Sequence, residues 1–76
     1  MKLGLYRARQ SIYPDNARIL RVNDLFLVTM FVDKWDKHYS VVKYIDLFSL
    51  EKSYFTFVKI SGLDGLWNLG EHLEKQ

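Results

Sequence analysis

Three runs of apolar and aromatic residues, each about as long as a β-strand, most constrain what this chain can fold into. They occupy residues 25–32, 39–46 and 54–60, and each is shorter than a typical helix. The first run reads Leu-Phe-Leu-Val-Thr-Met-Phe-Val, and aromatic and β-branched residues favour strands. The runs therefore predict an all-β fold. Because both faces of the first run are apolar, we expect that strand to be covered on both sides.

The run at 39–46 has one apolar face and one mixed face. Successive side chains of a strand point to opposite sides, so alternate residues share a face. The odd positions are apolar except for Lys43, whereas the even positions combine apolar residues with Ser40 and Asp46. The pattern distinguishes the two faces without assigning either of them to the core.

Turn-forming residues separate these runs and mark weaker elements around them. Pro14 presets its own backbone angle, and Asp15 and Asn16 can bond the nearby backbone, so we expect a turn there. Arg7 and Arg9 would share one face of a first strand. The remaining predicted elements are that first strand at 5–10, a short apolar segment at 19–22, loops at 33–38, 49–53 and 61–65, and one helical turn at 68–73.

Length and composition predict one small domain held together by its core. The chain has 76 residues and no cysteine, which excludes disulfides and thiolate–zinc sites. Hydrophobic residues make up 49% of the chain and aromatic residues 16%, and each large aromatic side chain buries much surface. We therefore expect a single domain over 1–76 with a dense core, no cofactor, no signal peptide and a cytoplasmic location.

Two segments carry a family resemblance. Residues 20–28 read Leu-Arg-Val-Asn-Asp-Leu-Phe-Leu-Val, and residues 64–75 read Asp-Gly-Leu-Trp-Asn-Leu-Gly-Glu-His-Leu-Glu-Lys. They resemble the segment leading into the second strand and the closing segment of Src-homology-3-like (SH3-like) barrels, especially bacterial ones. Asn23 stands where glycine is usual, and asparagine is the next-best residue for a left-handed backbone position. His72 stands where tyrosine is common.

This resemblance implies a small SH3-like barrel of five or six antiparallel strands with one short terminal helical turn, and a binding role. Two long strand runs stand where bacterial members often have one, which implies an added strand or a long hairpin. The resemblance also implies an acidic first loop in members that bind proline-rich peptides, but Arg18 and Arg21 occupy it here. A basic loop would prefer an acidic protein surface or phosphate. The tyrosines that would line an aromatic groove are Tyr6, Tyr13, Tyr39 and Tyr44.

Catalysis and metal binding receive little support from the sequence. It contains no cysteine nucleophile, no Gly-x-Ser-x-Gly motif and no phosphate-binding loop, so we expect a protein that is not an enzyme. Asp33, Asp36 and His38 cluster in one predicted loop, and oxygen and imidazole ligands can hold a divalent ion. A charged hairpin tip in solvent explains the same cluster more simply, and we predict no metal site.

Basic residues concentrate near the N-terminus although the net charge is only +2. Five cations face the single acid Asp15 within residues 1–21, which is typical either of an anion-binding surface or of a solvated edge. Trp35 lies among charged residues, where it would serve as a partner contact or fold back to cap the core. The predicted partner-binding residues are Tyr6, Arg7, Arg9, Tyr13, Arg18, Arg21 and Trp35.

These features predict a non-catalytic protein-interaction module whose partner is another protein with an acidic surface. A small accessory or inhibitory factor of a phage or mobile element, docking onto a host protein, fits that description. The alternative is a small barrel that binds nucleic acid through the same arginines and tyrosines, with an affinity that falls steeply with salt. A third interpretation is a structural subunit that assembles through its sheet edges. No membrane partner is expected, and a monomer and a homodimer both fit.

Overall fold

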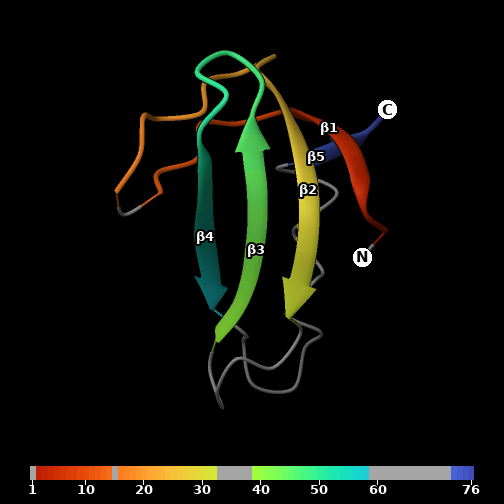
Figure 1. The fold of residues 1–76 in the computed structure, drawn as a ribbon, viewed down its shortest axis with the longest axis vertical. Helices are drawn as coiled ribbons and strands as arrows, with labels where there is room; N and C mark the ends of the chain where they lie inside the picture. Colours follow the sequence, from red (N-terminus) through yellow and green to blue (C-terminus); the bar gives the residue numbers. More distant parts are fainter. Residues whose placement is uncertain (1, 15, 33–38, 59–72) are drawn as a thin grey trace.

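The computed structural model describes residues 2–14, 16–32, 39–58 and 73–76, and this part of the chain is all-β. Five antiparallel strands form one sheet in the spatial order β4-β3-β2-β1-β5 (Figure 1). The last strand pairs with the first, so both chain ends lie on the same side of the sheet. The strands are β1 (Gly4–Ala8), β2 (Leu25–Val32), β3 (Tyr39–Asp46), β4 (Lys52–Val58) and β5 (Leu73–Lys75).

The three apolar runs of the sequence form strands close to the predicted positions. The predicted strands at 25–32 and 39–46 are confirmed with the same bounds. The third begins at Lys52, two residues early, and the predicted first strand ends at Ala8. None of the described segments is a helix of the length and apolarity that crossing a bilayer requires. Three predictions lie wholly or partly outside the described residues: the loops at 33–38 and 61–65, and the end of the strand at 59–60. Of the helical turn predicted at 68–73, residues 68–72 also lie outside them, and its last residue, Leu73, is in strand β5.

A β-bulge in β2 shifts the alternation of its side chains by one residue. Val28 pairs with Tyr44 and Met30 pairs with the preceding residue of β3, so Thr29 is the extra residue between them. A one-residue insertion reverses the alternation of side chains beyond it. Phe31 therefore packs against the core, whereas Met30 is 48% exposed. The prediction that this strand is covered on both sides is wrong, because the bulge moves an apolar residue into solvent.

The core lies on one face of the sheet, and aromatic rings form its centre. The Phe26 ring stacks on Tyr6 with centroids 6.1 Å apart. It also meets Tyr44 edge-on at 5.6 Å and Phe55 edge-on at 6.3 Å. Offset and edge-to-face pairs of this kind add stabilisation beyond the area they bury. The high aromatic content of the chain is thus used to fill a small interior.

The mixed face of β3 is the one that points into this core. Ser40, Val42, Tyr44 and Asp46 are all buried, whereas Lys43 on the other face is exposed. Polar groups are tolerated inside a fold when they have partners. Asp46 is bound by Arg18 of the β1–β2 connection and by the backbone N–H of Phe48 in the β3–β4 turn, and the alternation of side chains along one strand does not reveal these partners.

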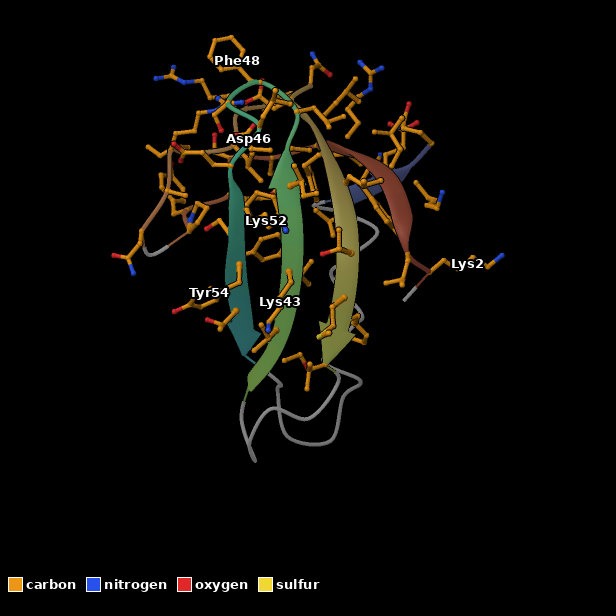
Figure 2. All side chains as sticks on the ribbon, in the orientation of Figure 1. Lys2, Lys43, Asp46, Phe48, Lys52 and Tyr54 are labelled. Atoms are coloured by element: carbon orange, nitrogen blue, oxygen red, sulfur yellow. The ribbon has the colours of Figure 1, made fainter. Side chains whose placement is uncertain are left out.

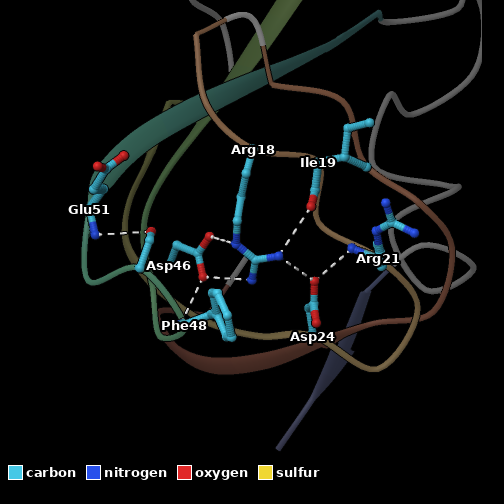
Figure 3. A network of polar contacts seen from close by, with 8 residues as sticks. Arg18, Ile19, Arg21, Asp24, Asp46, Phe48 and Glu51 are labelled. Carbon is cyan, nitrogen blue, oxygen red and sulfur yellow. Dashed lines mark hydrogen bonds and ion pairs between the residues drawn. The ribbon is translucent and has the colours of Figure 1, made fainter.

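The long connection between β1 and β2 folds back on itself and packs under the core. Ile12 and Leu20 exchange two backbone hydrogen bonds, of 2.8 and 2.9 Å, and both side chains join the core cluster. At its end, Asn23 has a φ of 75°, as expected for a residue replacing glycine in a left-handed position. Its N–H donates to the carbonyl of Ala8. These backbone hydrogen bonds place Arg18 against the turn between β3 and β4 (Figure 3).

Candidate functional site: an apolar tip

The turn between β3 and β4 exposes apolar residues where turns are usually polar. Residues 47–50 read Leu-Phe-Ser-Leu, whereas glycine, proline, asparagine, aspartate and serine dominate most turns. Phe48 is 83% exposed and Leu50 is 74% exposed. Leu50 also has a φ of 61°, which strains the backbone of a residue with a branched side chain. Figure 2 shows Phe48 at the end of the molecule, beyond β3.

Arg18 fixes this turn by binding the carboxylate at the end of β3. Its Nε and Nη2 donate to Oδ2 and Oδ1 of Asp46, the second over 3.0 Å (Figure 3). Its Nη1 donates to Oδ2 of Asp24 over 3.1 Å. A bidentate guanidinium–carboxylate pair is stronger and more directional than a neutral hydrogen bond. The side chain of Arg18 therefore joins two parts of the β1–β2 connection, its own and the residue just before β2, to the end of β3.

Asp46 organises the turn from inside. It is only 3% exposed, and its Oδ1 accepts the backbone N–H of Phe48 over 2.9 Å. Its carbonyl accepts the N–H of Leu50 over 2.7 Å. Burial acts to raise the pKa of the Asp46 carboxyl, but bonds from Arg18 and from the backbone outweigh burial and hold this pKa below its ordinary value. The carboxylate is therefore charged at neutral pH and keeps the turn in one conformation.

The same arginine also contacts the exposed aromatic ring. The guanidinium carbon of Arg18 lies 4.7 Å from the centroid of the Phe48 ring, within the range of a cation–π contact. The ring is thus oriented although most of it is in solvent. A preformed aromatic contact loses less conformational entropy on binding than a freely rotating one.

Two further apolar side chains come from the β1–β2 connection. Ile19 and Val22 are exposed, and the carbonyl of Ile19 lies 3.4 Å from Nη1 of Arg18. The backbone N–H of Arg21 donates to Asp24 over 2.8 Å and closes the network (Figure 3). We call the exposed apolar residues of these two segments the apolar tip: Ile19, Val22, Leu47, Phe48 and Leu50.

The structure changes the reading of the predicted tyrosines. Tyr6 is 6% exposed, stacks on Phe26 and donates its hydroxyl to the carbonyl of Lys2. It is a core residue, so its predicted role in partner binding is wrong. Tyr44 is buried as well, so the predicted tyrosine groove does not form. Tyr13 is exposed on the β1–β2 connection, as a contact residue would have to be.

The predicted arginines do not act as one basic surface. Arg18 is bound to two carboxylates, and Arg7 is half-buried in β1. Arg9 and Arg21 are exposed. Trp35 and the loop residues Asp33, Asp36 and His38 lie outside the described part of the chain.

Sequence reasoning missed the residues at the centre of this site, Asp46, Phe48 and Leu50. The predicted loop at 49–53 begins after Phe48, whereas the turn in the structure covers residues 47–49 and includes it. Two adjacent apolar residues between strand runs were the available signal. The pairing of Asp46 with Arg18 had no local signal, because it spans 28 positions.

Comparison with known proteins adds no constraint to this geometry. No protein-family model, no curated protein and no solved structure matches the chain. The functional argument therefore depends on the site itself.

Proposed function

We propose that this protein is a non-catalytic interaction module that docks onto another protein through its apolar tip. The observation that carries the proposal is the display of Phe48, which is 83% exposed and yet oriented by Arg18. Aromatic and arginine side chains are enriched among the residues that dominate binding energy at protein interfaces. A cluster of exposed apolar side chains at one end of a small protein is typical of an interaction site.

We further propose that the sheet curls into an SH3-like barrel. The strand order β4-β3-β2-β1-β5 supports this, since it returns the last strand to the first. The long folded connection between β1 and β2 and the left-handed Asn23 support it as well. In such a barrel the tip lies at one end, on turns that the strands hold in place.

The partner surface that fits the tip is an apolar pocket large enough for one aromatic ring. Arg21 lies beside the tip and would favour a carboxylate at the rim of that pocket. The charge of Arg18 is already balanced by Asp24 and Asp46, so apolar contact carries more of the binding than charge. A small factor that inserts its tip into a cleft of a larger host protein, as a phage or mobile-element inhibitor would, is consistent with this geometry.

The nucleic-acid alternative loses support from the same observations. It requires arginines that are available to phosphates beside tyrosines that are available for stacking. Arg18 is bound to two carboxylates, and Tyr6 is in the core.

Affinity capture from the native cell tests the proposal, with the double variant Phe48→Ser, Leu50→Ser beside the wild type. The matched control is Leu3→Ser, which removes an exposed leucine next to β1, away from the tip. We expect the double variant to lose a protein that the wild type and the control retain, with or without nuclease treatment. Equal capture by all three proteins would refute the tip as the docking site. A captured species that disappears after nuclease treatment would refute a protein partner.

A further inference from the structure

Part of the face opposite the core is a second accessible surface, although Val41 on that face is buried. Met30, Lys43 and Tyr54 pair side by side across β2, β3 and β4. All three are exposed, Met30 by 48% and Tyr54 by 41%. Lys43 and Tyr54 lie over the same part of β3 and β4, with Lys52 nearby (Figure 2). We call Met30, Lys43, Ile45, Lys52 and Tyr54 the outer face.

The two lysines of the outer face occupy one diagonal of a four-residue square. Lys43 pairs with Tyr54, and Ile45 pairs with Lys52 two positions further along the strands. Diagonal neighbours in an antiparallel pair are about 7–8 Å apart. Tyr54 and Ile45 occupy the other diagonal, so each ammonium group has an apolar side chain on either side.

These cations have no carboxylate to balance them on the described strands. The one acid in β2, β3 and the described side chains of β4 is Asp46, which is buried on the core face and bound to Arg18. Within the described residues, neither Lys43 nor Lys52 forms an ion pair. The outer face therefore presents positive charge and apolar area together.

The arrangement argues against a second copy of the chain as the occupant. In a two-fold dimer the same patch meets itself, which would place Lys43 and Lys52 of one copy against those of the other. Like charges brought together in an interface disfavour association. The complementary surface is one with carboxylates and apolar side chains on the same side.

We propose that the outer face binds an extended acidic segment of a partner protein. Residues two apart in an extended chain point to the same side and are about 7 Å apart, which matches the diagonal between the lysines. Two acids separated by one residue would meet Lys43 and Lys52, and apolar residues flanking them would pack on Tyr54 and Met30. This site is separate from the apolar tip and does not depend on it.

A synthetic peptide tests the proposal directly. The probe is Leu-Thr-Glu-Thr-Glu-Thr-Leu, blocked at both ends, and the control peptide has glutamine in place of both glutamates. Amide chemical shifts of the labelled full-length protein report binding and its location. We expect shifts in β3 and β4 with the glutamate peptide, at least tenfold weaker binding of the glutamine peptide, and weaker binding at higher salt. Absence of shifts in β3 and β4 would overturn the proposal.

Charge variants separate the outer face from general electrostatics. Lys43→Glu with Lys52→Glu should abolish peptide binding, whereas Lys43→Arg with Lys52→Arg should retain it. The matched control is Lys2→Glu with Arg21→Glu, which makes the same change in net charge at exposed positions elsewhere. Equal loss in the control would overturn the site, as would unchanged binding in the first variant.

Two further probes decide between classes of occupant, and one variant separates this proposal from the tip. Tighter binding of oligothymidylate, or of phosphatidylserine vesicles, than of the peptide would refute an acidic protein segment as the occupant. Phe48→Ser should bind the peptide as well as the wild type does. A loss in that variant would show that the outer face is not independent of the tip.

Discussion

Arg18 and Asp46 stand 28 residues apart in the sequence and form a two-point ion pair that ties the β1–β2 connection to the end of β3. Around this pair the fold and the candidate site depend on each other. The arginine satisfies a buried carboxylate, and the carboxylate in turn holds the backbone N–H of Phe48. The conformation of the apolar tip is therefore linked to the stability of the whole domain.

Removing the arginine should destabilise the protein. In Arg18→Met the apolar stem is retained, but the carboxylate of Asp46 remains buried without its guanidinium. We expect the free energy of unfolding in urea to fall by about 1–3 kcal/mol, because an unpaired buried charge is costly and Arg18 is partly exposed. Arg21→Met is the control and should change stability by less than about 0.5 kcal/mol. Adding Asp46→Asn to Arg18→Met should recover part of the loss, and a simple sum of the two single losses would contradict this coupling.

Stability should also depend on pH through Asp46. Its native pKa lies below that of an unfolded aspartate, so the ion pair stabilises the native state fully above the unfolded value of about 4. The contribution disappears as the pH falls through the lower native pKa. The unfolding free energy of the wild type should exceed that of Asp46→Asn by a constant amount above about pH 5, and the difference should shrink towards about pH 2. A difference that stays constant down to that pH would mean that the charge of Asp46 is not what stabilises the turn.

Removing the buried hydroxyl of Tyr44 should not destabilise the protein, in contrast to the loss of Arg18. Among the described residues, this fully buried hydroxyl has no hydrogen bond of good geometry, and burial raises its pKa more than the nearby side chain of Ser53 lowers it. Removing an unpaired buried polar atom without changing the ring should not weaken the core. We expect Tyr44→Phe to unfold at the same urea concentration as the wild type or a higher one. Tyr6→Phe is the contrast, because it loses the bond to the carbonyl of Lys2 and should be less stable.

The local pattern of the sequence was enough to predict most of the sheet. The strand bounds at 25–32 and 39–46 follow from apolar runs, whereas the left-handed conformation of Asn23 was implied by the resemblance to SH3-like barrels, in which glycine is usual at that position. The bulge at Thr29 could not be read in the same way, because both sets of alternate positions in this run are apolar and a one-residue shift leaves no mark in such a pattern. That ambiguity also concealed the exposure of Met30.

The candidate site was harder to predict than the sheet because it depends on contacts between distant residues. Charge along residues 1–21 predicts a basic surface that includes Arg18, but Asp24 lies just beyond that segment and Asp46 lies 28 positions away. The sequence predicts Tyr6 as a partner contact, but its alternation with Ala8 places both on the buried face of β1. Charge counted along the chain therefore overestimated the positive surface that the fold presents.

The strained backbone of Leu50 predicts that stability and binding can be separated. Glycine adopts its φ of 61° without strain, so Leu50→Gly should raise the free energy of unfolding by about 0.5–1 kcal/mol, the relief of strain exceeding the entropy that glycine loses on folding. The same variant removes a side chain that is 74% exposed, so it should also weaken partner capture. Leu50→Ala is the control, because it loses the side chain but keeps the strain, and it should weaken capture with no gain in stability. If Leu50→Gly were less stable than Leu50→Ala, the conformation of Leu50 would not reduce the free energy of unfolding. The inference that Leu50 is retained for binding would then have no physical basis.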